Sequence, residues 1–259
     1  MINENELKNK LLDSKSKKEI SKEFNISPAT LSKYIEKYNL EEFYRYSKSI
    51  RQQRNNNSVD IDFFKTIDTE EKAYIFGLIL SDGWISNRNL GFTFQETDVD
   101  ILEKVKHCLK SQHKISYKYY DYRKPQYTLV ISSKEIVEDL KALGITSNKS
   151  FDATIPFDKI APELIRHVVR GIFDGDGSFS QNRPCICTSS VSLRDGIINW
   201  CISNYNYSPS VSTQNNKYRV YFRKPGFKVI CDIYQDSSIY MNRTYNSFQE
   251  YYKYRIKNQ

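Results

Sequence analysis

The chain has 259 residues, and its hydrophobic and charged fractions of 39% and 27% are typical of a folded globular protein, not a disordered one. It lacks a stretch of roughly 18 uncharged apolar residues and its charged N-terminus has no apolar signal core, so we expect neither a membrane partner nor secretion, but a protein of the cytoplasm, an organelle or a phage-infected host cytosol. A formal net charge of +8 favours a polyanionic partner such as nucleic acid.

Residues 16–40 have the pattern of two short helices joined by a tight turn. Apolar residues recur every three or four positions, and Asn25 is a residue type that tolerates the left-handed backbone of such a turn. Ser27 and Pro28 fit the N-cap and first turn of the second helix. We interpret residues 1–46 as a small all-α, helix-turn-helix-like DNA-binding domain, with a protein-binding helical hairpin as the alternative. The residues expected to face DNA are Thr30, Ser32 and Lys33.

Residues 47–65 are expected to be a basic linker. The segment 47–60 has few apolar residues and carries Lys48, Arg51 and Arg54. It either follows a phosphate backbone or serves as a plain solvated tether.

From residue 66 to residue 259 the chain contains a weak internal repeat. In each half an apolar helix precedes two strands, an amphipathic helix, two further strands and a last helix. The first half has these elements at 70–83, 84–89, 90–96, 99–111, 114–122, 126–132 and 134–144. The second half has them at 162–177, 178–182, 185–190, 193–203, 208–214, 217–223 and 226–235. We therefore predict an α+β fold with two pseudo-symmetric αββαββα halves, about 66–154 and 155–259.

The five cysteines indicate neither a disulfide framework nor a zinc site. Their number is odd and no paired CxxC spacing occurs. Cys185 and Cys187 lie on one face of a predicted strand, and we interpret them as core thiols in a reducing compartment.

The first helices of the two halves share a motif. Each has two small residues four positions apart and then ends in Asp-Gly, with the acid at Asp82 in one half and Asp176 in the other. The small pairs are Gly77 with Ser81, and Gly171 with Gly175. Small residues let two helix backbones approach closely, which would bring the two carboxylates together at the negative ends of their helices. Divalent metal ions would offset their repulsion, in the arrangement that holds the attacking and leaving oxygens of a phosphodiester.

These segments resemble the LAGLIDADG motif of the homing endonucleases. Residues 75–83 read IFGLILSDG and residues 169–177 read VRGIFDGDG, so the eighth-position acid that ligates metal in that family falls on Asp82 and Asp176. The resemblance covers about residues 66–255. It implies Mg²⁺ or Mn²⁺ as the cofactor. Its implied ligands are Asp82, Asp176 and backbone carbonyls near Ser81 and Gly175.

The resemblance also assigns further catalytic roles. It places polar residues near the scissile phosphate at Gln95 and Asp98, and an active-site lysine at Lys149. The sixth-position acid is Asp174 in the second copy, whereas the first has Leu80. Where related sequences often read Arg-Lys-Tyr near the end of the second half, this chain reads Arg243-Thr244-Tyr245, so the second lysine is missing.

The family architecture implies two four-stranded antiparallel saddles that lie over the major groove, with alternate strand residues facing DNA. On the last strand, either Tyr221 or Arg223 would face the duplex. The implied DNA-binding residues of the two halves are Arg88, Lys118, Arg123, Lys124, Gln181, Arg183, Lys217, Arg219 and Arg223.

We therefore predict a site-specific, metal-dependent DNA endonuclease that cuts a long asymmetric duplex as a monomer with internal pseudo-two-fold symmetry. The alternatives are a DNA-binding regulator of the same fold that has lost cleavage, an intron maturase that binds intron RNA, and a non-enzymatic architectural protein. Asp82, Asp176 and Lys149 favour the nuclease over a protein that only binds DNA, whereas the sequence does not separate the nuclease from the maturase. The missing second lysine favours the regulator, or a nuclease that nicks one strand first.

Overall fold

The computed structural model describes residues 2–12, 16–54, 58–120, 123–147 and 149–258. The chain forms two compact units. The N-terminal unit comprises Met1–Ile61 and Leu109–His113, and the large unit comprises Asp62–Cys108 and Lys114–Gln259. None of the described helices combines the length and the apolar composition that crossing a membrane requires.

Four helices are present in the described part of the N-terminal unit. They are α1 (Glu4–Leu12), α2 (Lys17–Glu23), α3 (Pro28–Lys37) and α4 (Glu41–Arg54). The hydroxyls of Ser16 and Ser27 accept hydrogen bonds from the first turns of α2 and α3, and Asn25, in the turn between these helices, has a φ of 52°. Both short helices expected over residues 16–40 are therefore present. A buried apolar core holds the N-terminal unit together. It is formed by Ile2, Leu7, Leu11, Ile20, Leu31, Ile35 and Leu40.

The segment expected to be a linker, residues 47–65, is more ordered than predicted. Helix α4 continues to Arg54, and four apolar side chains follow the undescribed residues 55–57. These side chains, which are buried, belong to Val59, Ile61, Phe63 and Phe64. The backbone N–H groups of Asp60 and Gln112 donate to the carbonyls of Leu109 and Ser58, so residues 58–61 are fixed by pairing with residues 109–113.

The large unit contains both predicted halves. The first half has α5 (Glu70–Ser81), β1 (Trp84–Ser86), β2 (Asn89–Gln95), α6 (Val99–Cys108), β3 (Ile115–Tyr120), β4 (Arg123–Ser132), α7 (Lys134–Ala142) and α8 (Lys149–Asp152). The second has α9 (Ile165–Asp176), β5 (Gly177–Ser178), β6 (Cys185–Thr188), α10 (Val191–Tyr205), β7 (Ser210–Gln214), β8 (Lys217–Tyr221), α11 (Phe227–Tyr234) and α12 (Asn242–Lys257). The αββαββα order is confirmed in both halves, and each half ends in an additional helix, α8 or α12. Short 3-10 turns precede α6, α9, β6 and α11, at η1 (Glu96–Asp98), η2 (Pro162–Leu164), η3 (Ser180–Asn182) and η4 (Lys224–Gly226).

Each half folds into a four-stranded antiparallel sheet, and the two sheets have the same strand order. The orders are β1-β2-β4-β3 and β5-β6-β8-β7. In the first sheet Leu90, Phe92 and Phe94 of β2 point into the core, while Thr93 and Gln95 lie on the opposite face. The alternation leaves one face of each sheet polar.

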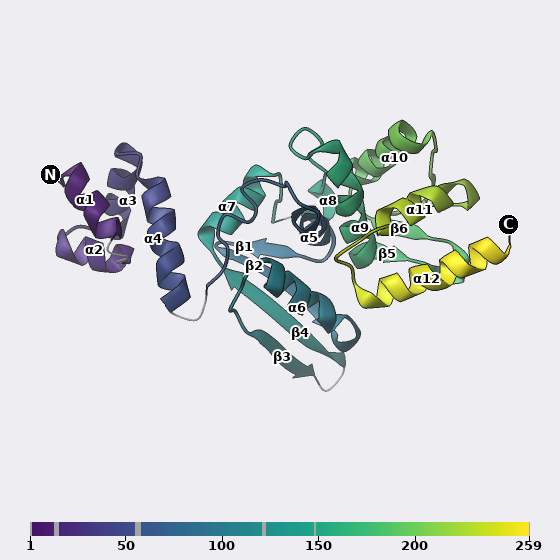
Figure 1. The fold of residues 1–259 in the computed structure, drawn as a ribbon, viewed down its shortest axis with the longest axis horizontal. Helices are drawn as coiled ribbons and strands as arrows, with labels where there is room; N and C mark the ends of the chain where they lie inside the picture. The colour runs from purple at the N-terminus through teal and green to yellow at the C-terminus, as the bar shows by residue number, and fades with distance from the viewer. Residues whose placement is uncertain (1, 13–15, 55–57, 121–122, 148, 259) are drawn as a thin grey trace. The chain divides into compact units, whose positions relative to one another are not determined.

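Helices α5 and α9 pack against each other at the centre of the large unit (Figure 1). A Cβ atom at Gly77 would overlap the carbonyl group of Val168, and one at Gly171 would overlap the carbonyl oxygen of Tyr74. The two backbones are therefore in direct contact, as the small residues of the motif predict. Forcing a side chain between them would cost about 1–3 kcal/mol or more.

A buried ionic network fixes the N-terminal part of α9. The guanidinium of Arg170 is fully buried and donates to the carboxylate of Glu70 at 2.7 Å and to the carbonyls of Ile233 and Ile239 at 2.9 and 3.0 Å. A buried charge is tolerated only when it is paired and hydrogen-bonded in this way. The network ties α5, α9 and the segment after α11 into one body.

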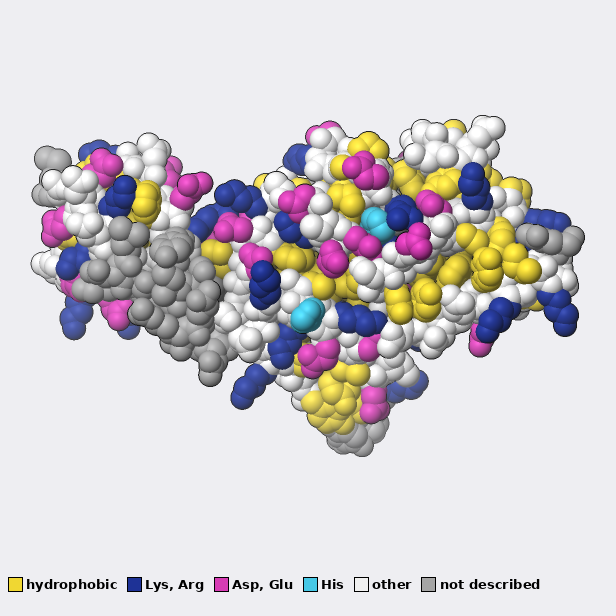
Figure 2. Space-filling view, in the orientation of Figure 1, with side chains coloured by type: hydrophobic (Ala, Val, Ile, Leu, Met, Phe, Trp, Pro, Cys, Tyr) yellow, Lys and Arg dark blue, Asp and Glu magenta, His cyan; other side chains and the backbone are white. Residues whose placement is uncertain are grey.

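Hydrophobic side chains gather over α11 and α12 on the face of the large unit seen in Figure 2, where acidic and basic side chains are interspersed. The exposed ones on α12 are Tyr252, Tyr254 and Ile256. This hydrophobic region is distinct from the polar faces of the two sheets, which contain the candidate site.

Candidate active site

The two motif aspartates lie at the C-terminal ends of the paired helices. Asp82 caps α5 and Asp176 is the last residue of α9. A Cβ atom at Gly175 would lie 2.5 Å from a carboxylate oxygen of Asp82 and would overlap the Ser81 hydroxyl. Glycine at position 175 therefore allows the Asp82 carboxylate to lie directly against the last turn of α9.

Both carboxylates are unfavourable in their ionised form. Burial is the main cause that raises the pKa of Asp82, and the carboxylate of Asp98 adds to it. Burial and the nearby Asp82 charge raise the pKa of Asp176 to about 6. Burial is thus the main reason that both carboxyls have raised pKa values, and the nearby Asp82 charge adds to it at Asp176.

Lys149 lies close enough to both acids to interact with their charges. Its ammonium donates to the carbonyl oxygen of Leu80 at 3.3 Å and, more closely, to that of Ser81, at the C-terminal end of α5. Burial lowers the pKa of Lys149, whereas the carboxylates of Asp82 and Asp176 raise it. One cation therefore interacts with both motif acids and with the negative end of a helix dipole.

The second half has a threonine at the equivalent place. Lys149 begins α8 and Thr244 lies in the first turn of α12, the additional helices of the two halves. The Thr244 hydroxyl donates to the carbonyl oxygen of Asp174 at 3.4 Å, and Asp174 holds the same motif position as Leu80. The two helices thus approach equivalent carbonyls, but only the first half supplies a charge there.

Asp98 joins the site together with a residue of the opposite half. It lies in η1 and accepts a hydrogen bond from Arg243 Nε at 2.7 Å. The charges of Asp98 and Arg243 shift the pKa of Asp82 upward and downward respectively. This ion pair connects the two halves beside Asp82, and the separation of its members in the sequence gives no local signal for it.

Gln95 occupies a different place. It is exposed at the end of β2, in register with Gln126 of β4, which is in turn opposite Lys118 of β3. Side chains in one such row point to the same face of the sheet. Gln95 and Lys118 therefore share the polar face of the first sheet, and the described contacts do not connect Gln95 with Asp82.

Asp174 is a structural anchor of α9. Its carboxylate is fully buried and accepts hydrogen bonds from the hydroxyls of Tyr74 and Tyr234 at 2.7 and 2.6 Å and from the Met241 N–H at 2.7 Å. Burial raises its pKa to about 6, against the effect of these donors. The sixth-position acid thus joins α9 to α5 of the first half and to Tyr234 and Met241 of the second, a role that the sequence motif does not reveal.

The polar face of the second sheet adjoins Asp176. Lys217 and Arg219 are exposed on β8, and Arg219 lines a hollow together with Asp176 and Cys187. The interpretation of Cys185 and Cys187 as core thiols is wrong. Both are half-buried on this polar face, because Ile186 between them is the residue that points into the core.

The other residues expected to bind DNA are all exposed except Ser32, which is half-buried, and Arg123, whose side chain lies outside the described residues. In α3 the hydroxyl of Ser32 accepts a hydrogen bond from Lys17, and that of Thr30 is hydrogen-bonded to Ser27. Those exposed in the large unit are Arg88, Lys118, Lys124, Gln181, Arg183, Lys217, Arg219 and Arg223.

The residues at the helix ends fit a divalent cation. Carboxylates and backbone carbonyls are the oxygen ligands that Mg²⁺ and Mn²⁺ prefer. A cation between Asp82 and Asp176 would relieve the repulsion that raises the pKa of Asp176. The Ser81 carbonyl, expected to help bind metal, accepts the Lys149 ammonium here, although a carbonyl oxygen has a second lone pair.

Two stretches of the chain match known domain models. Residues 69–148 match the LAGLIDADG-like domain, and residues 165–233 match the WhiA LAGLIDADG-like domain. Each half of the large unit thus carries a LAGLIDADG-like domain. The replication factor C small subunit of Methanocaldococcus jannaschii is 24% identical over 132 residues, which are 50% of this chain and 7% of that protein.

Solved structures with a similar fold include homing endonucleases and WhiA. The homing endonuclease I-WcaI bound to its DNA recognition sequence is 13% identical, with 66% of this chain and 84% of that chain covered and a TM-score of 0.46. I-DmoI in complex with DNA and Ca is 12% identical, with 74% and 99% covered and a TM-score of 0.48. The N-terminal LAGLIDADG domain of DUF199/WhiA is 13% identical, with 69% and 91% covered and a TM-score of 0.46.

Proposed function

We propose that this protein is a site-specific, divalent-metal-dependent endonuclease that hydrolyses phosphodiesters in double-stranded DNA. The observation that carries the proposal is the pair of carboxylates, Asp82 and Asp176, at the ends of two helices packed through glycine, with the Lys149 ammonium near both. Two mutually repelling acids raise the free energy of the folded protein. A bound divalent cation would offset this cost.

Each of these side chains would have its own role in phosphodiester hydrolysis. Asp82 and Asp176 would hold the cation, which when bound lowers the pKa of water and offsets charge on the phosphate. Lys149 would stabilise the negative charge that develops on the phosphate as the P–O bond breaks. Lys217, whose charge acts on Asp176, and the other cations of the polar sheet faces would hold the DNA backbone.

A DNA-binding regulator without cleavage is the second candidate. Its support is the uncharged Thr244 in the place equivalent to Lys149, together with the match of the second half to the WhiA domain model. In such a protein Lys149 would serve as a fixed helix cap, a role that its hydrogen bonds to Leu80 and Ser81 already fulfil. An intron maturase is a third candidate, in which the same polar faces bind intron RNA.

A binding selection followed by a cleavage test separates these functions and requires no defined target sequence. The full chain is first used to enrich a randomised duplex library in EDTA, and the enriched duplexes are then incubated with the protein and Mg²⁺. Cleavage at a fixed position supports the endonuclease. Enriched duplexes that stay intact in Mg²⁺ and Mn²⁺ support the regulator, whereas preferential enrichment of a parallel RNA library supports the maturase.

The motif acids give the sharpest variants for this test. Asp82→Asn and Asp176→Asn keep the size of the side chain but remove the charge that holds the cation, so each should slow cleavage by at least about a hundredfold. Duplex affinity in EDTA should be unchanged or slightly tighter, because a negative charge near phosphates is lost. Asp158→Asn, an exposed change elsewhere in the unit, is the control and should cut at the wild-type rate. Undiminished cleavage by both motif variants would refute the assignment.

A further inference from the structure

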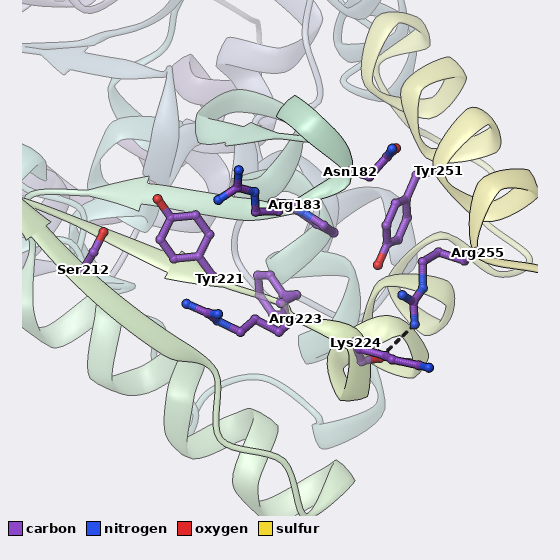
Figure 3. A pocket seen from close by; sticks show the side chains of 10 residues that line it. Asn182, Arg183, Ser212, Tyr221, Arg223, Lys224, Tyr251 and Arg255 are labelled. Atoms are coloured by element: carbon purple, nitrogen blue, oxygen red, sulfur yellow. Dashed lines mark hydrogen bonds between the residues drawn. The ribbon is translucent and has the colours of Figure 1, made fainter. Parts of the chain in front are cut away.

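A second hollow lies where β8 ends, next to the polar face of the second sheet. It has a volume of about 520 Å³ and is lined by residues of η3, β8, η4 and α12. In Figure 3, Arg183, Tyr221 and Arg223 lie on one side of this pocket, and Lys224, Tyr251 and Arg255 lie on the other. We call it the β8 pocket.

The β8 pocket is strongly cationic. Its lining includes three arginines and one lysine but no carboxylate, and the described residues form no ion pair with these four. Arg223 Nε donates to the neutral Ser210 hydroxyl at 2.7 Å, and an Arg255 terminal nitrogen donates to the Lys224 carbonyl at 3.4 Å. Arg255 Nε is buried with no hydrogen-bond partner among the described residues. Positive charge without anionic partners points to an anionic ligand.

The remaining lining of the pocket is largely apolar, and its accessible aromatic ring is that of Tyr221. Phe222 and Tyr251 are buried and Pro184 lies beside them, while the half-exposed ring of Tyr221 forms part of the wall. An accessible aromatic ring beside several cationic side chains suits a molecule with a planar ring and phosphate groups. Proteins that bind unpaired nucleotides combine the same two features, with bases stacked on aromatic side chains and phosphates held by cations.

The pocket continues into the hollow that contains Asp176. The two share Arg183 and Tyr221, so their linings are contiguous. Arg219, which lines the Asp176 hollow, is four residues from Arg223, or roughly 13 Å along an extended strand. That distance spans roughly four nucleotides of stacked strand at about 3.4 Å each.

We infer that the β8 pocket binds one unpaired nucleotide of the DNA strand whose phosphates cross the Asp176 hollow. The half-exposed ring of Tyr221 would stack on the base, and the arginines would hold its phosphate. The inference rests on the proposed function only in taking DNA as the polymer. A free nucleotide offers the same base and phosphate, but it cannot also contact Arg219 and Lys217, so the contiguous lining favours a strand.

Direct binding in EDTA tests the pocket without any need for cleavage. The probes are a short oligothymidylate with a fluorescent base analogue, thymidine monophosphate, and a blunt duplex. The oligothymidylate should bind at least about tenfold more tightly than the mononucleotide, with quenching of the analogue as it stacks. Arg255→Gln and Tyr221→Leu should each weaken oligothymidylate binding by about tenfold. Lys253→Gln removes the same charge from an exposed position of α12 outside the pocket and should leave that affinity near the wild-type value.

The outcomes separate the pocket from the nuclease. Equal effects of Arg255→Gln and Lys253→Gln on oligothymidylate binding would overturn the inference, as would a mononucleotide that binds as tightly as the oligomer. Arg255→Gln should weaken the blunt duplex no more than Lys253→Gln does, because a paired base cannot enter the pocket. If the enriched duplexes remain uncut in Mg²⁺ while the oligothymidylate results hold, the endonuclease fails and the pocket stands.

Discussion

The protonation of the Asp176 carboxyl is coupled to the stability of the folded protein. The pKa of this carboxyl is raised to about 6 by burial and by Asp82, well above the ordinary value of 3.8. The folded protein therefore binds this proton more tightly than the unfolded chain does. By linkage, the contribution of Asp176 to stability is present at low pH and is lost as the pH rises through about 6, and the buried Asp174 acts in the same direction.

This sign predicts a pH-dependent response to metal. In EDTA the Tm of the wild type should fall relative to that of Asp176→Asn as the pH is raised from about 4 to 7, because Asp176 ionises in unfavourable surroundings. Mg²⁺ binds the ionised carboxylates, so it should raise the Tm at pH 7 and have little effect at pH 5. Thermal unfolding of the wild type and of Asp176→Asn measures both effects. An equal Mg²⁺ response in the variant would show that the ion binds elsewhere.

At the scale of elements, α8 and α12 have the same place in the two halves but carry different chemistry. Each approaches the carbonyl of the sixth motif residue, α8 through the Lys149 ammonium and α12 through the Thr244 hydroxyl. The sequence indicates that the second half lacks this lysine, and the contacts of the two helices differ accordingly. Because a fixed charge at a phosphoryl centre is typically worth about 10²–10³-fold in rate, the two strands of DNA should be cut at unequal rates.

The asymmetry predicts a nicked intermediate. Supercoiled plasmid carrying the enriched target should pass through an open circle before it becomes linear. Lys149→Met should slow chiefly one of the two cuts, and Thr244→Lys, which restores the charge in the second half, should shorten the life of the open circle. Gel analysis over time, with the nicked strand identified by sequencing, measures this. Direct conversion to linear DNA by the wild type would mean that another group substitutes for the second lysine.

At the scale of the molecule, two units share one chain. The large unit includes both LAGLIDADG-like domains, while the N-terminal unit has its own core and presents α3 with Thr30 and Lys33 exposed. The paired segments 58–61 and 109–113 show where the chain can be cut. Removing residues 1–54 keeps both paired segments in the chain, whereas a cut after residue 60 would remove most of one of them.

If the N-terminal unit binds DNA, the protein without residues 1–54 should bind the enriched duplex more weakly. The slope of affinity against salt concentration should also become less steep, because phosphate contacts are lost. Lys33→Gln in the full chain should reduce the slope by about one phosphate contact. Titrations at several salt concentrations provide the measurement. An unchanged affinity and slope would make the unit a protein-binding or regulatory module.

The sequence by itself determined the order of the elements and the pair of aspartates. Apolar periodicity, turn residues and small-residue spacing are local signals, and they sufficed for both αββαββα halves and for the close contact of α5 with α9. Two helical segments were not predicted. In α12 the tyrosines and polar residues obscure the apolar periodicity, and α4 extends to Arg54, beyond its expected end.

Only the tertiary structure decided how the site is assembled. Lys149 reaches a carbonyl 69 residues away, and Arg243 pairs with an acid 145 residues away in the other half. It also decided that Cys187 lies beside Asp176, that Gln95 does not meet Asp82 in the described contacts, and that the β8 pocket exists. Periodicity shows which side of an element is buried. It cannot show which distant side chains meet there. That depends on how closely α5 and α9 pack and on where α8 and α12, the helices that end the two halves, are placed.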